Sequence, residues 1–246
     1  MNNLNNYSAN PNDFARKLFS GLPQRYDLLA QLLSFGQDYR WREEMVSHLA
    51  PHQPNHVLDV ATGPGGVARM LIKKGVRKVT GVDLSQDMLY QAKANITRLN
   101  LENKINLVLS KGEELPFSNK TFDGLSFTYL LRYVVDPSKT IKELSRVLKY
   151  GAPMVNLEFY IPQNYFWKFL WSYYTKYLLP ALGKQLGGQA WEEVGRFLGP
   201  NIENYYNNFN LEQHLQAWKE AGFENVAYKT MSVGGGIIFW GTKTNG

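Results

Sequence analysis

Between about residue 55 and residue 160, short apolar runs alternate with longer stretches whose apolar positions recur at helical spacing. The runs predict buried strands, and the amphipathic stretches between them predict crossover helices. We expect strands at 56–60, 78–83, 105–110, 122–129 and 152–160, and helices at 65–75, 85–100 and 137–149. Because strands that alternate with helices form βαβ units, this pattern predicts a doubly wound parallel sheet.

The end of the chain has a different pattern. A helical stretch at 210–222 is followed by two strand-like runs, 223–231 and 234–243, with no crossover helix between them. A late hairpin of this kind predicts an antiparallel edge on an otherwise parallel sheet. The expected fold class is therefore α/β: a Rossmann-like, seven-stranded, mostly parallel sheet with an antiparallel last strand, N-terminal helices and a helical aromatic insertion.

Three segments lie outside the alternation. Residues 1–11 are polar and rich in Asn, and we expect them to be disordered. Residues 12–50 have the pattern of short helices that precede the first strand. Residues 161–205 are aromatic, with spaced Lys and interruptions at Gly and Pro, and we expect a helical lid or insertion there. All of them are expected to belong to one domain, residues 1–246.

Composition narrows the chemistry. The 246 residues include no Cys, which excludes disulfides and thiolate sites, and the four His residues form no helical pair because Pro51 and Pro54 interrupt the spacing of His48 and His52. We expect no metal. No signal-peptide core or long apolar span is present, so a cytoplasmic location is expected. The net charge of +6 suits an acidic partner surface or simply a solvated basic one.

An acid and three glycines close the first expected strand in HVLDVATGPGG, residues 56–66. The dinucleotide fingerprint Gly-x-Gly-x-x-Gly has no acid four positions before its first glycine. Asp59 could accept a hydrogen bond from a ligand ammonium, whereas it would repel a pyrophosphate. Asp83 ends the next strand, where a carboxylate can hold both ribose hydroxyls of an adenosine. An amino-acid tail and an adenosine ribose together describe S-adenosylmethionine, the expected cofactor.

From about residue 55 to 160 the sequence resembles the class I S-adenosylmethionine-dependent methyltransferases. The stretches DVATGPGG, GVDLSQDML, GEELPFSNKTFD and RVLKYGAPMVNLEF carry the resemblance. It implies a cofactor site made of Asp59, Ala61, Gly63, Gly65, Asp83, Leu84, Met88, Gly112, Glu113 and Thr128.

In that site the resemblance implies that Leu84 and Met88 pack against the adenine and that Gly112 and Glu113 meet its edge. The superfamily often has Asp before this glycine, where this chain has Lys111, so we expect only backbone contacts with the adenine amine. Taken singly, Asp59 or Asp83 could cap a helix and Met88 could be ordinary core.

From about residue 14 onward the chain also resembles the C-methyltransferases of menaquinone and ubiquinone biosynthesis. The segments RYDLLAQLLSFGQDYRWR, LLRYVVDPSKTIKELSRVLKYGAPMVNLEF, YLLPALGKQLGG and AGFENVAYKTMSVGGGIIFWG carry this resemblance. Its most specific part is a spaced motif made of Tyr26, Asp27, Ser34, Gly36 and Trp41. It implies that the acceptor is a prenylated quinol, methylated at carbon.

The departures from that family gather where the acceptor is expected. Ala30 and Tyr133 stand where the family usually has Asn, and Asp38 stands where it usually has His. The Pro-Gly-Gly turn is replaced at 150–152, and the Glu-x-Ser ending is replaced at 158–160. Another acceptor, such as a polyketide, a different aromatic natural product or a lipid head group, therefore stays open, as does a cofactor-binding protein without turnover.

Carbon methylation needs an electron-rich ring, which a hydroquinone provides best as its phenolate. Arg132 could stabilise that oxyanion, and Asp38, or Asp27 through a water, could take the proton. Tyr26 and Tyr129 could orient the ring. The structural alternatives are an ion pair for Arg132, for example with Asp136, an N-cap role for Asp38 and a core position for the tyrosines.

The aromatic segment could act as a lid, a dimer interface or an interfacial helix, because Trp and Tyr with interspersed Lys are typical of helices that lie on membranes. The expected partners are a small or lipid-tailed aromatic substrate, with membrane contact and a homodimer as open possibilities. No segment resembles a nucleic-acid-binding module, so nucleic acid is not expected as a partner.

Overall fold

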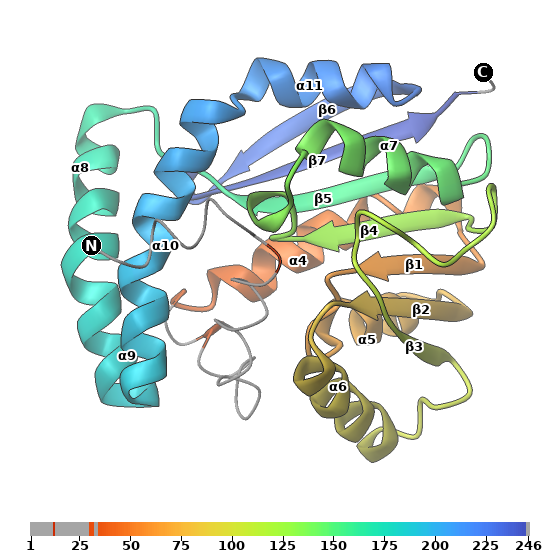
Figure 1. The fold of residues 1–246 in the computed structure, drawn as a ribbon, viewed down its shortest axis with the longest axis horizontal. Helices are drawn as coiled ribbons and strands as arrows, with labels where there is room; N and C mark the ends of the chain where they lie inside the picture. The colour runs from red at the N-terminus through yellow and green to blue at the C-terminus, as the bar shows by residue number, and fades with distance from the viewer. Residues whose placement is uncertain (1–11, 13–29, 32–33, 245–246) are drawn as a thin grey trace.

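The computed structural model describes residue 12, residues 30–31 and residues 34–244 of the chain. Its centre is a seven-stranded sheet in the order β3-β2-β1-β4-β5-β7-β6 (Figure 1). The strands are β1 (His56–Val60), β2 (Lys78–Asp83), β3 (Ile105–Leu109), β4 (Gly124–Thr128), β5 (Pro153–Phe159), β6 (Phe223–Met231) and β7 (Gly236–Lys243). Only β7 runs against its neighbours, β5 and β6, so the expected fold class is confirmed.

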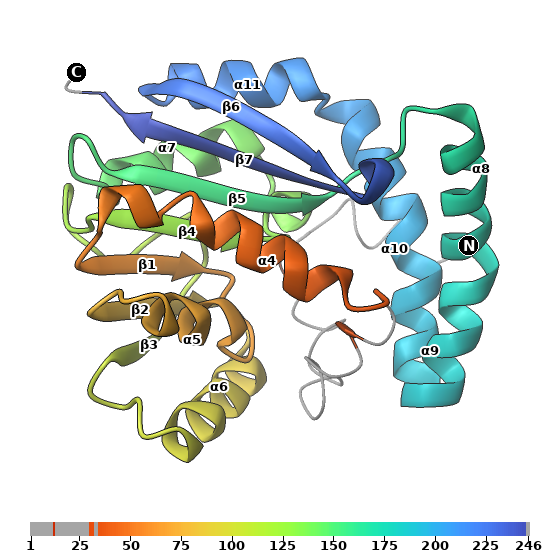
Figure 2. The same ribbon diagram turned by 180° about the vertical axis from the view of Figure 1, so that it is seen from behind.

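Helices cover both faces of the sheet. They are α4 (Gln37–Ser47), α5 (Gly66–Lys73), α6 (Gln86–Arg98), α7 (Pro137–Val147) and α11 (Leu211–Glu220), with short 3₁₀ turns η1 (Ala50–His52), η2 (Leu131–Tyr133) and η4 (Ser232–Gly234). Figure 1 shows α7 and α11 in front of the sheet, and Figure 2 shows α4 and α5 in front of its other face. The sheet is therefore buried on both sides, as its nearly continuous apolar strands require.

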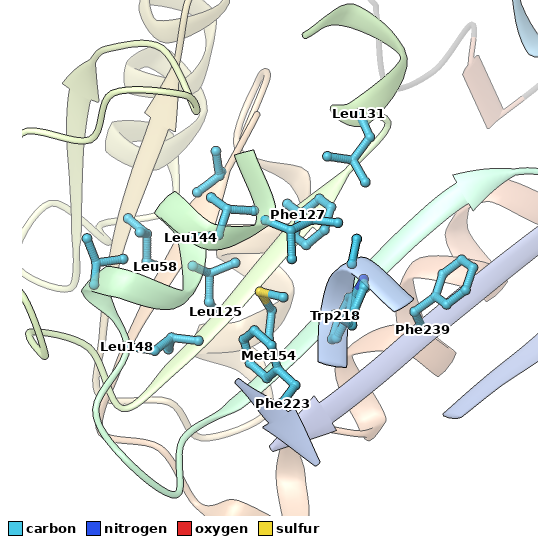
Figure 3. Packing of buried hydrophobic residues seen from close by; sticks show 14 of the residues in the cluster. Leu58, Leu125, Phe127, Leu131, Leu144, Leu148, Met154, Trp218, Phe223 and Phe239 are labelled. Carbon is cyan, nitrogen blue, oxygen red and sulfur yellow. The ribbon is translucent and has the colours of Figure 1, made fainter. Parts of the chain in front are cut away.

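Alternate residues of β1 separate the two cores. Leu58 and Val60 pack in one cluster with residues of α7 and α11, whereas Val57 packs in the other with residues of α4, α5 and α6. Figure 3 shows the first cluster, in which Trp218 of α11 lies among strand side chains. Its ring stacks on Phe127 of β4 and on Phe239 of β7, at centroid distances of 6.4 and 6.3 Å.

A helical hairpin stands beyond the carboxyl ends of the central strands. It consists of α8 (Tyr165–Tyr173), the π-helix η3 (Tyr174–Leu178), α9 (Leu179–Gly187) and the antiparallel α10 (Gln189–Asn208) (Figures 1 and 2). Glycines let α10 approach closely: a Cβ on Gly195 would lie 2.8 Å from the Pro180 backbone, and one on Gly199 would lie 2.9 Å from the Thr175 hydroxyl. The hairpin is therefore packed as a unit, and its inner side faces the sheet end.

The N-terminal part of the chain is described only in part. Of the short helices expected within residues 12–50, those at 13–22 and 25–33 fall largely outside the described residues, whereas α4 confirms the one at 38–50. Among the described residues, no helix is long and apolar enough to cross a bilayer.

Candidate functional site

A cavity of about 120 Å³ opens where the chain leaves the carboxyl ends of β1, β2 and β4. In the strand order these ends include the point between β1 and β4 at which successive connections turn in opposite directions, the usual ligand site of open α/β sheets. It is lined by Asn12, Arg42, Val60, Ala61, Thr62, Gly63, Pro64, Asp83, Leu84, Ser85, Met88, Ser110, Gly112, Thr128, Tyr129, Leu130 and Tyr133. We refer to it as the cofactor cavity.

The loop after β1 forms one wall of the cofactor cavity. Ala61 and Gly63 both have φ of 55°, in the left-handed region, and Gly65, with φ of 81°, precedes α5. A Cβ on Gly63 would meet no protein atom within 4 Å, so a side chain there would occupy space that the loop leaves to the cavity. Gly65 does not line the cavity; its hypothetical Cβ would instead face Ala92 of α6 at 3.5 Å.

Asp83 lies in the cofactor cavity and holds its loops together. Its Oδ2 accepts a 2.8 Å hydrogen bond from the Gly63 amide, and its Oδ1 accepts one of 2.8 Å from the Ser85 amide. Burial raises the pKa of Asp83, against these amides, which lower it. Because a carboxylate has about four acceptor positions, Asp83 can also accept hydrogen bonds from ligand hydroxyls.

Asp59 lies beneath the cofactor cavity and does not line it. Its side chain is buried, with Oδ2 accepting a 2.6 Å hydrogen bond from the Thr62 hydroxyl and Oδ1 accepting one of 2.7 Å from the Ser126 hydroxyl. Burial raises the pKa of Asp59 to about 6. These contacts make Asp59 a brace between the β1 loop and β4.

Of the other residues expected at the cofactor site, some line the cofactor cavity and one does not. Leu84, Met88, Gly112 and Thr128 line the cavity. Glu113 does not: its carboxylate accepts hydrogen bonds from the Val135 amide and from the Asn12 side chain, at 2.9 and 2.6 Å. Lys111 is exposed and also lies outside the lining.

A second, larger cavity of about 440 Å³ lies between α4, the sheet end and the helical hairpin. We call it the acceptor cavity. Most of its walls are apolar, and α8, η3, α9 and α10 supply Trp167, Leu170, Trp171, Tyr174, Thr175, Leu179, Trp191, Val194, Gly195, Leu198 and Ile202. The aromatic segment that lies outside the strand–helix alternation therefore forms one side of a cavity.

Arg132 lies in the wall of the acceptor cavity and is 1% exposed. Its Nε donates to Glu158 Oε1 at 2.8 Å and its Nη1 to Asn201 Oδ1 of α10 at 2.6 Å. Burial lowers the pKa of Arg132, but the Glu158 carboxylate outweighs this and raises it, so the guanidinium stays charged. The structural ion pair that the sequence left open for Arg132 is present, but its partner is Glu158. The example partner Asp136 is wrong, because its side chain accepts from the Lys139 amide and caps α7.

A second polar group faces the acceptor cavity from the opposite element, α4. Asp38 is buried there, with Oδ2 2.9 Å from Nε of Arg42 and Oδ1 accepting a 2.7 Å hydrogen bond from the Tyr129 hydroxyl. The N-cap of α4 is Gly36, so the capping role left open for Asp38 is wrong. Burial and the Asp38 charge raise the pKa of Tyr129 well above 10, which keeps the phenol protonated.

Three residues line both cavities: Arg42, Tyr129 and Tyr133. The two cavities therefore share a wall, so that ligands bound in the two cavities would lie next to each other. Sequence reasoning missed Arg42, and it missed Glu158 and Asn201 as partners of Arg132. The i to i+4 spacing of Asp38 and Arg42 on one helix was the available signal for the first. Tyr26 and Asp27 lie outside the described residues.

The described residues contain no cluster of His, Asp and Glu that could hold a metal ion.

A model of the ubiE/COQ5 methyltransferase family matches residues 8–243. The chain is 32% identical over 247 residues to the ubiquinone/menaquinone biosynthesis C-methyltransferase UbiE of Rickettsia felis, with 96% of each chain covered. The match to the Rickettsia akari protein of the same name is 32% over 226 residues, covering 90% of this chain and 88% of that one.

Solved structures agree on the fold. Phosphoethanolamine N-methyltransferase 2 of Haemonchus contortus, crystallised with S-adenosylmethionine, superposes with a TM-score of 0.66 at 15% identity, covering 94% of this chain and 60% of that one. The [4+2]-cyclase SpnF superposes with a TM-score of 0.55 at 16% identity, covering 83% and 81%. Because proteins of such different activity share this fold, these likenesses establish the fold alone.

Proposed function

The chain belongs to the ubiE/COQ5 methyltransferase family, and we propose that it transfers the methyl group of S-adenosylmethionine to a ring carbon of a prenylated quinol. The observation that carries this proposal is the wall of Arg42, Tyr129 and Tyr133 shared by the two cavities. It joins a cofactor cavity to a larger apolar cavity that contains a buried cation. A lipophilic ring that carries developing negative charge suits the second cavity.

The cofactor cavity fits S-adenosylmethionine by the chemistry of its lining. We propose that Asp83 holds the ribose through its remaining acceptor positions and that Leu84 and Met88 lie against the adenine. Gly63, whose missing side chain leaves the cavity open, would let the backbone approach the ligand. Asp59 then acts through Thr62, by fixing the β1 loop. When bound, the cofactor supplies an electrophilic methyl group on a sulfonium.

We propose that Arg132 stabilises the negative charge on the phenolate oxygen of the acceptor. A hydroquinone attacks best as its phenolate, and a charge-assisted contact to the oxyanion contributes roughly 2 to 3 kcal/mol. Glu158 and Asn201 hold the guanidinium of Arg132 from the side of β5 and α10. With the cofactor bound, a bond would form between the ring carbon and the methyl carbon as the methyl–sulfur bond breaks, leaving S-adenosylhomocysteine. The methylated ring carbon would then give up its proton to water, which restores the aromatic ring.

Asp38 is our proposed acceptor for the phenolic proton. It is a buried carboxylate in the acceptor cavity, and Arg42 and Tyr129 fix its orientation. Tyr129 cannot take the proton itself, because its pKa is raised well above 10. Asp27, acting through a water, and Tyr26, orienting the ring, remain the other proposals for this step. In addition, holding the ring in line with the methyl group can supply on the order of 7 to 11 kcal/mol.

A different acceptor within the same reaction class is favoured by one observation. Tyr133, which stands where the resembling family usually has Asn, lines both cavities and packs its ring 5.0 Å from the Arg132 guanidinium. A phenol ring at this position takes up space next to the reacting atoms. A polyketide, another aromatic natural product or a lipid head group is therefore our second candidate.

We propose a lipid-tailed substrate as the partner and peripheral contact with a membrane as the setting. Support comes from the apolar walls of the acceptor cavity and from the aromatic helix α8 beside it. Self-association of the chain through the same helix is the competing use of this surface.

The test is transfer of a labelled methyl group from S-adenosylmethionine to a demethylated prenyl naphthoquinone or benzoquinone, with and without a reductant that forms the quinol. We expect label in the ring only under reducing conditions. The Asp83→Asn variant serves as the control for cofactor-dependent transfer. If neither quinol becomes labelled while the protein still binds S-adenosylhomocysteine, the proposed acceptor is contradicted and the second candidate is favoured.

A further inference from the structure

The acceptor cavity reaches the surface beside α8. Four large apolar residues that line it are also exposed: Phe35 (70%), Trp167 (41%), Leu170 (39%) and Val233 (58%). A side chain that faces both a cavity and solvent marks the cavity's opening. The mouth of the acceptor cavity is therefore rimmed by large apolar side chains.

Two of these rim residues are held outward in an unfavourable backbone conformation. Phe35 and Val233 both have φ of 53°, in the left-handed region that bulky and β-branched residues avoid. The loop that carries Val233 is fixed to α4, because Ser232 Oγ accepts from Trp41 Nε1 at 2.9 Å and donates to Gln37 Oε1 at 2.7 Å. Strain at an exposed apolar tip persists where the neighbouring structure imposes it, and such sites are often functional.

The helix next to the mouth, α8, has an apolar surface that no element of the described part of the chain covers. None of the nine residues of α8 is buried, and Tyr165, Phe166 and Phe169 are 92%, 61% and 67% exposed. In both ribbon views α8 lies at the outer edge of the molecule, with α10 on its inner side (Figures 1 and 2). Contiguous exposed apolar side chains of this size mark an interaction surface.

Charge identifies the partner. The sequence contains no Asp or Glu between residues 161 and 191, but it has Lys168, Lys176 and Lys184 there. Lys184 pairs with Glu192 at 3.1 Å, whereas Lys168 and Lys176 are exposed among the aromatic side chains. Exposed Trp, Tyr and Phe mixed with Lys are typical of helices that lie in the headgroup region of anionic bilayers.

We infer that this surface, formed by α8, Phe35 and Val233 and called here the docking face, binds an anionic lipid bilayer and opens the acceptor cavity directly into it. The inference rests on the proposed function in one respect, that the acceptor carries a prenyl tail. A tail anchored in the bilayer then passes through the mouth while the ring stays near Arg132. The ring never has to cross water.

A second copy of the chain fits this surface less well. In a two-fold symmetric pair the same patch meets itself, so Lys168 and Lys176 of both copies would be brought together without a facing acid from this segment. Like charges facing each other across an interface disfavour association. An anionic lipid surface turns the same two charges into a favourable contribution.

The test compares binding of the full chain to sedimented vesicles of phosphatidylcholine alone and with phosphatidylglycerol. The variant Tyr165→Ser/Phe166→Ser/Phe169→Ser changes three exposed residues of α8, none of which lines the acceptor cavity. Its matched control is Tyr90→Ser/Leu109→Ser, which removes exposed apolar side chains of α6 and β3, 62% and 56% exposed. A third variant, Lys168→Gln/Lys176→Gln, removes charge only.

We expect the wild type and the control to bind anionic vesicles, and the triple variant to bind them at least about tenfold more weakly. The charge variant should lose roughly tenfold on anionic vesicles and little on neutral ones. Methylation of a short-tailed, water-soluble quinol should be the same in all four proteins. Methylation of a long-tailed quinol embedded in vesicles should fall with vesicle binding.

Two results would overturn the inference, and with it the proposed membrane contact, and leave the proposed methyl transfer to a quinol standing. One is methylation of the short-tailed quinol by a wild type that binds no vesicle. The other is a dimer in solution that the triple variant converts to monomers, again without vesicle binding by the wild type. Vesicle binding that is lost in the triple variant, together with no methylation of any quinol, would support the docking face and contradict the proposed function instead.

Discussion

The hydroxyl of Tyr129 donates a 2.7 Å hydrogen bond to the carboxylate of Asp38, joining the end of β4 to α4 across 91 residues of sequence. Tyr129 is also held with φ of 56° and stacks on Phe159 at a centroid distance of 4.4 Å. A strained aromatic residue at the wall between two cavities suits a positioning role. It fixes one face of the acceptor cavity and the orientation of the carboxylate that we assign to proton transfer.

Tyr129→Phe should lower kcat for the quinol about tenfold, because a hydrogen bond to a charged group contributes roughly 1.5 to 3 kcal/mol and only part of that acts in the transition state. The affinity for S-adenosylhomocysteine should stay within about twofold. Steady-state kinetics and calorimetry measure the two quantities. Tyr90→Phe, on the exposed face of α6, is the control. A kcat equal to that of the wild type would show that Asp38 needs no orientation by Tyr129.

The buried pair of Arg132 and Glu158 allows stability and activity to be separated. Arg132→Met leaves the Glu158 carboxylate without its cation in a buried site, which should cost about 3 to 5 kcal/mol of unfolding free energy. The double variant Arg132→Met/Glu158→Met removes both charges and should recover most of that stability, because apolar replacements of a buried ion pair are often neutral. Denaturant unfolding measures both variants.

If Arg132 stabilises the phenolate, kcat for methyl transfer should nevertheless fall at least about a hundredfold in both Arg132→Met and Arg132→Met/Glu158→Met. Cofactor affinity should change little, since Arg132 does not line the cofactor cavity. A double variant that is stable and retains wild-type kcat would make the role of Arg132 purely structural.

Asp83→Asn should weaken S-adenosylhomocysteine binding more than tenfold, about 1.4 kcal/mol or more. The neutral amide has one acceptor atom in place of two. Its NH₂ group would face the backbone N–H of Gly63 or Ser85, which now donates a hydrogen bond to the carboxylate, so two donors would meet. Titration calorimetry measures the affinity. Asp87→Asn changes an exposed acid on the first turn of α6 and should have no effect. Equal binding by both variants would remove Asp83 from the cofactor site.

The local pattern of the sequence predicts most of the fold because each element is consistent with its own periodicity. The expected strands 56–60 and 78–83 coincide with β1 and β2, and the helix bounds near α5, α6 and α7 agree within a few residues. These features need only short-range information.

The partners within the site needed long-range information. Asp136, four residues from Arg132, was the nearest acid in sequence, but the parallel register of β4 and β5 places Glu158 beside Arg132 instead. Asn201 reaches the same guanidinium from α10, 69 residues away. Thr62 and Ser126, which donate hydrogen bonds to the carboxylate of Asp59, could likewise be identified only from the three-dimensional placement of the β1 loop and β4. Side-chain direction at a strand end is set by packing that no local pattern encodes.

Asp59 also makes the stability of the protein depend on pH. Burial raises its pKa from 3.8 to about 6, and the hydroxyls of Thr62 and Ser126 only partly offset this. Between these two values the folded state binds more protons at this position than the unfolded state does. The free energy of unfolding therefore falls as the pH rises from about 4 to about 6 and stays lower above it.

Asp59→Asn should remove this contribution, which is on the order of 3 kcal/mol for a shift of about two pKa units. Above pH 6 the ligand-free variant should therefore be more stable than the wild type, and below pH 4 the two should differ little. Urea unfolding at pH 4, 5, 6 and 7.5 measures the difference, with Asp87→Asn as the surface control. A difference that is independent of pH would show that Asp59 is ionised at all these values, and that Thr62 and Ser126 stabilise its charge more strongly than burial opposes it.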